Sequence, residues 1–168
     1  MTSPTGSAPQ GRDTIDVDAP AGLLWDLIAD SRELPSWGPP VKRVEVMGDK
    51  IEPERIGTPR KVEAQFGRKA GYFVEHRVEH VEGRMIAYVI DKDDFGLARF
   101  MAGPGFSLEL EPLSSGKTRV AFSFFHDPRG IGRLLNPVIK IQQRRNRLAA
   151  LASLKREAER RAVTPTLQ

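Results

Sequence analysis

The chain has 168 residues, of which 39% are hydrophobic and 29% charged, and its formal net charge is +4. This length and apolar content suit one domain with a sizeable core, and the absence of cysteine excludes a disulfide scaffold, a thiolate metal site and a cysteine nucleophile. No apolar run approaches the roughly 20 residues that cross a bilayer, so we expect a soluble, cytoplasmic protein.

The N-terminal part of the chain predicts a leader followed by a strand and two helices. The stretch MTSPTGSAPQGR has no apolar core, which predicts a disordered leader over residues 1–11 rather than a signal peptide. Alternating apolar residues predict a short strand over 14–18, and the helical spacing of AGLLWDLIAD predicts a helix over 21–30. A second short helix, SRELPSW, begins at a capping Ser31 and ends at a Gly-Pro-Pro run.

The middle of the chain alternates apolar and polar residues between Gly or Pro turns, a pattern typical of strands. The predicted strands cover residues 41–47, 58–66, 72–81, 84–90, 97–101, 106–112 and 118–126. Apolar residues on one side and polar residues on the other indicate an antiparallel sheet with one covered face.

A long helix over residues 131–161 is predicted to cover that face, and Pro137 should kink or restart it. We expect Arg147 to face water, and the buried stripe to consist of Val138, Ile141, Leu148, Leu151 and Ala152. One helix on one curved sheet is an α+β layout. The domain would span residues 12–161, with a disordered tail over 162–168.

The C-terminal helix also carries the basic character of the chain. Residues 129–161 contain ten lysines or arginines and two acids. A charged outer face of an amphipathic helix explains this most simply, and docking on anionic membrane or nucleic acid is the alternative. No aromatic residues lie among the arginines, which argues against stacking on single-stranded nucleic acid, so we expect no nucleic-acid partner. A weak contact with anionic membrane is kept as the alternative.

The segment YFVEHRVEHV contains His76-x-x-Glu79-His80, which resembles a zinc-peptidase motif. Its β-branched and aromatic residues favour a strand, in which the two histidines lie roughly 13 Å apart. One zinc ion cannot bind both at that separation, so we expect no metal site. The alternation instead places Tyr72, Val74, His76 and Val78 together on the inner, apolar side.

Three stretches of this sequence resemble the START-like (Bet v 1-like, SRPBCC) helix-grip superfamily, particularly its bacterial polyketide cyclase/dehydrase branch. They are IDVDAPAGLLWDLIAD (15–30), LPSWGPPVKRVEV (34–46) and LEPLSSGKTRVAFSFF (110–125). The resemblance implies a curved antiparallel sheet of about six to seven strands around a long C-terminal helix. It also implies an apolar cavity between sheet and helix for lipids, polyketides or isoprenoids, with no cofactor.

The alternation then predicts which side chains line this cavity. The predicted ligand-binding residues are Trp37, Phe66, Tyr72, Val74, His76, Tyr88, Phe106, Leu108, Phe122, Phe124, Ile141, Arg145 and Leu148. Arg145 lies within the helix stripe, where it would meet a ligand carboxylate or extend to solvent. Such a lining is typical of a small-molecule pocket, although the same residues also suit a filled core.

We therefore predict binding of a hydrophobic small molecule, for transport or sequestration. The alternative is a cyclase or dehydrase in which His76 and Tyr88 act as general base and hydrogen-bond donor. A buried His–Tyr pair with a purely structural role is the competing interpretation of these two residues.

Overall fold

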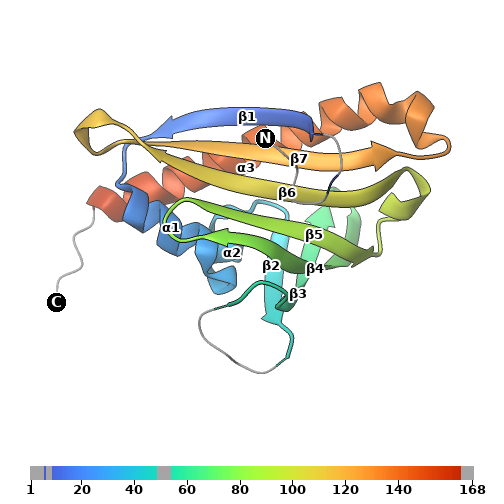
Figure 1. The fold of residues 1–168 in the computed structure, drawn as a ribbon, viewed down its shortest axis with the longest axis horizontal. Coiled ribbons are helices and arrows are strands. Elements are labelled where there is room, and N and C mark those ends of the chain that lie inside the picture. The colour runs from blue at the N-terminus through green and yellow to red at the C-terminus, as the bar shows by residue number, and fades with distance from the viewer. Residues whose placement is uncertain (1–5, 7–8, 49–53, 164–168) are drawn as a thin grey trace.

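The computed structural model describes residues 6, 9–48 and 54–163 (Figure 1). Its elements follow the predicted order of a strand, two helices, consecutive hairpins and a long helix. The strands are β1 (Pro9–Val17), β2 (Val41–Val46), β3 (Pro59–Phe66), β4 (Lys69–Val81), β5 (Met85–Asp93), β6 (Met101–Pro112) and β7 (Thr118–Pro128). The helices are α1 (Ala21–Ala29), α2 (Leu34–Trp37) and α3 (Gly132–Val163), with 3₁₀ turns at Ser31–Glu33, Leu97–Arg99 and Ser114–Gly116.

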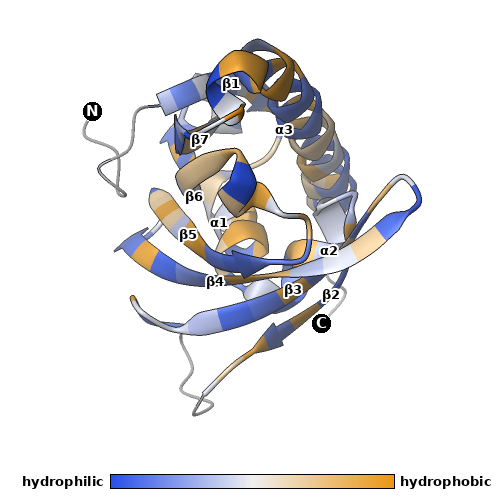
Figure 2. Ribbon diagram, turned by 90° about the vertical axis from the view of Figure 1, so that its right-hand side faces the viewer, coloured by the Kyte–Doolittle hydropathy of each residue, from blue (hydrophilic) through white to orange (hydrophobic). Residues whose placement is uncertain are grey.

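The strands form one antiparallel seven-stranded sheet in the order β1-β7-β6-β5-β4-β3-β2. Every neighbouring pair except β1–β7 is consecutive in the chain, so hairpins build most of the sheet. Figure 2 shows that the sheet curves, with α1 and α2 on its concave side and α3 beside the β1 and β7 edge. This arrangement confirms the predicted helix-grip fold.

The hydrophobic core lies where α1 and the C-terminal half of α3 meet the concave face. Leu24, Leu27 and Ile28 on α1 are buried against Leu108, Leu110 and Val120 on the sheet. Leu151, Leu154 and Ala158 complete this core from α3, at the 3–4 spacing of one helix face.

Helix α3 is continuous, which corrects the predicted break at Pro137. This proline is the sixth residue of the helix, so its missing N–H removes only one hydrogen bond close to the N-terminus. The helix begins at Gly132, where a Cβ atom would overlap the backbone of Phe100. Only glycine permits this close approach of chain to chain.

Two other predicted boundaries are also corrected. Residues 9–11, assigned to the leader, pair with β7 as part of β1. The predicted strand over 97–101 is a 3₁₀ turn followed by the start of β6. The remaining leader residues, apart from Gly6, and positions 164–168 of the predicted tail lie outside the described residues.

Candidate functional site

A pocket of about 190 Å³ lies between the concave face of the sheet, α2 and α3, and is open to solvent on one side. Its walls are mainly apolar and aromatic. They include five of the predicted ligand-binding residues, Trp37, Phe66, Phe106, Phe122 and Phe124, together with Val62, Ala64, Phe73 and Ile90. The structure therefore brings together side chains from β3, β4, β5, β6, β7 and α2 that are distant in the sequence.

Aromatic rings continue from this pocket into the core across three neighbouring strands. Tyr88 on β5 stacks on Phe106 of β6 with 5.4 Å between ring centroids, and Phe106 meets Phe122 of β7 edge to face at 5.7 Å. Tyr88 at the inner end of this row and Leu108, both also predicted to contact ligand, are fully buried. They belong to the core that supports the pocket.

Strand β4 faces the other way from the prediction. Phe73 pairs with Val62 and Glu75 pairs with Arg60, and directly paired residues share a side of the sheet. Because Val62 and Arg60 face the interior, Phe73, Glu75 and Arg77 do so too, and Glu75 and Arg77 are buried. Of the predicted inner set, Tyr72, Val74 and His76 are therefore on the outer side, and Val78 lies at a register shift of β4.

This reversal separates the proposed catalytic pair. His76 is partly exposed, and its Nδ1 lies 2.7 Å from a carboxylate oxygen of Asp91 on the outer face. Tyr88 pairs with Arg77 on the inner face. The two side chains project from opposite sides of the sheet, so the prediction that they act together on one ligand is wrong.

The inner face of β3 and β4 instead holds a buried cluster of charges, which we call the arginine–glutamate cluster: Arg60, Glu75, Arg77 and Glu54. Arg60 donates from Nε to Glu75 Oε1 at 2.8 Å, and its guanidinium carbon lies 3.6 Å from the centroid of the Tyr88 ring. Burial raises the pKa of the Glu75 carboxyl above its ordinary value, and the adjacent Arg60 opposes that shift. Glu75 also lines the pocket, so this pair places charge in an otherwise apolar wall.

Arg77 is 1% exposed, and all three nitrogens of its guanidinium donate hydrogen bonds. Its Nη2 donates to the Tyr88 hydroxyl at 2.6 Å and to Glu54 Oε2 at 3.0 Å, while its Nη1 donates to Nδ1 of His80 at 2.9 Å. Since arginine can only donate, Nδ1 of His80 is the acceptor. The Nε2 of His80 then donates to Glu82 Oε2, at a distance of 3.0 Å between the two atoms. The His80 ring also meets the Trp25 ring edge to face, with 5.3 Å between centroids, so His80 lies next to the cluster.

Sequence reasoning missed this cluster, although one signal for it was present. Arg60 is in phase with Val62, Ala64 and Phe66, so the alternation of β3 already put it on the inner side. The β4 members carried no such signal, because the choice between its two faces depends on pairing with β3.

Helix α3 contributes a polar wall to the pocket, through Gln143, Asn146 and Arg147. Arg147, predicted to face water, is 4% exposed and donates from Nε to Asp13 at 2.8 Å. Within the described part of the chain, its Nη1 and the Oε1 of Gln143 are buried without a hydrogen-bond partner. A Cβ at Gly11 would overlap the Arg147 guanidinium, so glycine at that position of β1 makes room for it.

The predicted ligand contacts Ile141, Arg145 and Leu148 lie on the outer side of α3 and are exposed. The packing of Leu151, Leu154 and Ala158 selects which face turns inward, and continuing that face toward the N-terminus leads to Arg147 and Gln143. His126 is fully buried near this wall, with its Nε2 3.0 Å from Oδ1 of Asn136.

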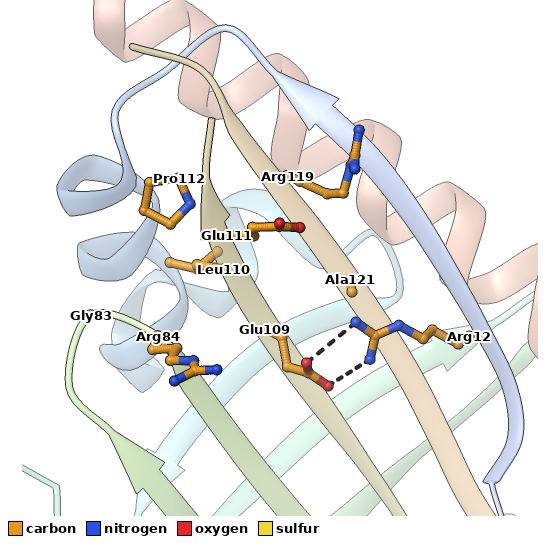
Figure 3. Close-up of a pocket in the computed structure, with 9 residues that line it drawn as sticks. All are labelled: Arg12, Gly83, Arg84, Glu109, Leu110, Glu111, Pro112, Arg119 and Ala121. Atoms are coloured by element: carbon orange, nitrogen blue, oxygen red, sulfur yellow. Dashed lines mark hydrogen bonds and ion pairs between the residues drawn. The ribbon is translucent and has the colours of Figure 1, made fainter. Parts of the chain in front are cut away.

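A larger hollow of about 550 Å³ lies on the outer face of the sheet. Figure 3 shows its charged lining, in which Arg12 and Glu109 form a bidentate pair with a shortest distance of 2.7 Å. Glu109, Glu111 and Arg119 alternate with the core residues Leu108, Leu110 and Val120. Because five of its nine lining residues are charged, this hollow offers a poorer site for a hydrophobic ligand than the pocket.

Two other functional classes can be addressed in the described residues. No group of three or more His, Asp or Glu side chains there is arranged to hold a metal ion. None of the helices described combines the length and apolar content required to cross a membrane. The segment containing His76-x-x-Glu79-His80 is strand β4, as predicted.

Comparisons with known proteins agree with this architecture. The sequence profile described as "Polyketide cyclase / dehydrase and lipid transport" matches residues 9–159. None of the curated proteins compared with the sequence matches it.

Solved structures resemble the chain in fold at low sequence identity. The Zhui aromatase/cyclase from a Streptomyces species is 19% identical with a TM-score of 0.73, covering 90% of this chain and 93% of that one. A START superfamily protein from Mycobacterium smegmatis is 15% identical with a TM-score of 0.66, covering 91% and 96%. The di-domain aromatase/cyclase BexL is 21% identical with a TM-score of 0.74, covering 89% of this chain and 46% of that chain.

Proposed function

Because the chain belongs to the polyketide cyclase/dehydrase and lipid transport family, we propose that it binds a hydrophobic small molecule of lipid, polyketide or isoprenoid type for transport or sequestration. The binding site would be the pocket between the concave face of the sheet, α2 and α3. Aromatic rings from three strands and Trp37 supply its apolar surface.

The observation that carries this proposal is the open, aromatic-lined pocket itself. A cavity of about 150 Å³ accommodates benzene, so about 190 Å³ has room for a small ring system or a segment of an acyl chain. A longer ligand would extend through the open side. Several exposed faces of phenylalanine would be covered by such a ligand, and this burial supplies the main driving force for binding.

The α3 wall supports a ligand that also carries oxygen. Arg147 Nη1 is a donor and Gln143 Oε1 an acceptor, and both lie buried without a partner in the described residues. Leaving such groups unsatisfied costs about 1–3 kcal/mol each, which a carbonyl, carboxyl or hydroxyl group could recover. The ligand class expected is therefore a ring or chain with an oxygen substituent facing α3.

The pocket can be tested by filling it. Ala150 lines the pocket on α3, whereas its neighbour Ala149 is exposed on the outer side. We expect Ala150→Phe to weaken binding of the aromatic anion anilinonaphthalene sulfonate at least tenfold, and Ala149→Phe to leave it unchanged. Circular dichroism would verify that both variants are folded. Equal affinity of the two variants would contradict binding in this pocket.

The natural ligand is best sought by native mass spectrometry of the chain isolated from its own host, followed by solvent extraction. A discrete bound mass that disappears in Ala150→Phe would support the proposal. A ligand retained by that variant would place binding elsewhere.

A cyclase or dehydrase activity is the second candidate, favoured by one observation. Glu75 places a carboxyl in an apolar pocket wall. Burial raises the pKa of this carboxyl, and Arg60 opposes the increase. Carboxyls in such settings can transfer protons to or from a carbon next to a carbonyl.

Product formation from a poly-β-ketone thioester, followed by liquid chromatography and mass spectrometry, separates the two candidates. An enzymatic role predicts turnover by the natural chain that falls at least 100-fold in Glu75→Gln, while affinity for the aromatic anion is kept. The absence of turnover would leave binding alone.

A further inference from the structure

The outer face of α3 exposes a row of large apolar side chains. Leu134, Val138, Ile141 and Leu148 are 83%, 65%, 58% and 42% exposed. With about 3.6 residues per turn, these positions fall on one side of the helix, opposite Leu151 and Leu154 of the core. We call these four residues the α3 outer stripe. A contiguous apolar row of this kind on a folded domain marks an interaction surface.

Basic side chains accompany the outer stripe. Arg145 lies within it, between Ile141 and Leu148, and Arg133 and Lys140 are exposed on the same helix. Residues 128–156 contain no Asp or Glu at all. Among the residues that the structure describes, no acidic side chain pairs with Arg133, Lys140 or Arg145, whereas Arg144 is paired with Asp13. Figure 2 shows apolar and hydrophilic residues side by side along this helix.

We propose that the outer face of α3 docks on an anionic lipid bilayer surface. The apolar stripe would enter the boundary between headgroups and acyl chains, and the cations would meet the lipid phosphates. A helix lying in this plane needs both an apolar face and basic residues beside it. Each basic side chain near an anionic surface contributes about 1 kcal/mol, so the charges and the stripe act together.

The charges argue against a second copy of this chain as the occupant. Two outer stripes packed together would bring arginines and lysines of both helices into proximity, with no acid in this segment to separate them. The stripe itself argues against nucleic acid, because phosphates and sugars would leave the leucine, valine and isoleucine side chains without apolar partners.

Docking in this orientation has one structural consequence, which rests on the function proposed above. Ala150 and Arg147 line the pocket from the inner side of the same helix. A bilayer against the outer side would thus lie one helix diameter from the ligand site.

Vesicle flotation of the full chain tests the proposal directly. We expect co-flotation with vesicles of phosphatidylcholine and phosphatidylglycerol, much weaker binding to phosphatidylcholine alone, and loss of binding at high salt. The double variant Val138→Ser/Ile141→Ser should reduce binding about tenfold or more through lost apolar insertion. Arg145→Glu should reduce it by a similar factor.

Matched controls keep these effects specific to α3. Ile56→Ser removes an equally exposed isoleucine before β3, and Lys42→Glu makes the same charge change on β2. Both should bind vesicles like the natural chain. All four variants alter exposed residues, and thermal melting would verify that each is folded.

Binding that ignores lipid charge, or that survives both α3 variants, would overturn the proposal. So would no binding to the anionic vesicles. A dimer in sedimentation velocity that Val138→Ser/Ile141→Ser abolishes, without any vesicle binding, would assign the stripe to a second copy. These outcomes are independent of the ligand test, because the outer stripe does not line the pocket.

Discussion

The inner side of β4 and the outer side of α3 depart from the usual distribution of side chains in opposite directions. On β4, Glu75 and Arg77 are buried while Val74 and His76 face outward. On α3, Arg147 is buried while Val138 and Ile141 are exposed. The two regions differ in whether these unusual positions have partners within the chain.

The buried charges of β4 are almost completely satisfied from within. Arg77 alone donates to Tyr88, Glu54, His80 and the carbonyl of Ala29. Among residues 6, 9–48 and 54–163, the exposed apolar side chains of α3 have no comparable partner, which is why we assign them to contact with another surface. The comparison teaches that an inverted pattern is structural where its members bind each other, and indicates an external partner where they do not.

Removing Arg77 should produce the largest change in stability. Arg77→Met leaves Glu54 without its cationic partner and the Tyr88 hydroxyl without the arginine donor, and breaking a buried ion pair in this way costs about 3–5 kcal/mol. Urea unfolding would measure the free energy of unfolding. His76→Ala, one position away on the outer face, is the control and should change it by less than about 1 kcal/mol. Similar values for both variants would mean that the cluster does not stabilise the fold.

The two faces of α3 can be compared with one type of substitution. Leu151→Ala should lower the free energy of unfolding by about 2–5 kcal/mol, because Leu151 is buried in the core. Leu148→Ala should lower it by about 1 kcal/mol or less, because Leu148 is partly exposed. A large effect of Leu148→Ala in the isolated chain would show that the outer stripe already has an internal partner.

The polar wall near α3 should make stability sensitive to mild acid. Burial lowers the pKa of His126 below its ordinary value of 6.5, and the hydrogen bond to Asn136 only partly opposes this. The unfolded chain therefore binds a proton more readily than the folded chain. Stability should fall as the pH drops below about 6.5 toward the lower folded pKa.

Melting temperatures measured between about pH 7.5 and about pH 5, the range in which histidine ordinarily titrates, would test this. His126→Gln should flatten the profile, because glutamine keeps a donor for Asn136 but does not titrate. An unchanged slope in that variant would assign the pH dependence to another group.

The smallest effect is expected at the C-terminal end of α3, where an acid is paired on the surface. Hydrogen bonds from Arg160 and then Arg161 lower the pKa of Glu157 from 4.5 to about 2, against the effect of burial. The resulting stabilisation is present above pH 4.5 and lost as the pH falls toward about 2.

Comparing Glu157→Gln with the natural chain over this acid range would isolate the contribution of Glu157. Because Arg160 is largely exposed, solvent and salt should reduce the difference further. A difference that persists at high salt would contradict a surface pair.

The sequence by itself determined the fold and part of the aromatic lining of the pocket. Period-two alternation and the turns located all seven strands and added one over 97–101 that is mostly a 3₁₀ turn, and Trp37, Phe66, Phe106, Phe122 and Phe124 line the pocket. These inferences succeeded because hydrophobic alternation and turn residues are local properties of the chain.

Only the tertiary structure decided which face of β4 and of α3 turned inward. Alternation divides a strand into two faces, and the pairing of Glu75 with Arg60 chose between them. The register shift at Arg77/Glu79, which passes over Val78, further disrupts strict alternation in β4, so that His80 lies beside Arg77 on the inner side. On α3 the choice followed from the packing of Leu151, Leu154 and Ala158, which carried Arg147 inward and left Ile141 and Leu148 outside. Both choices depend on contacts between residues far apart in the chain, which local patterns do not encode.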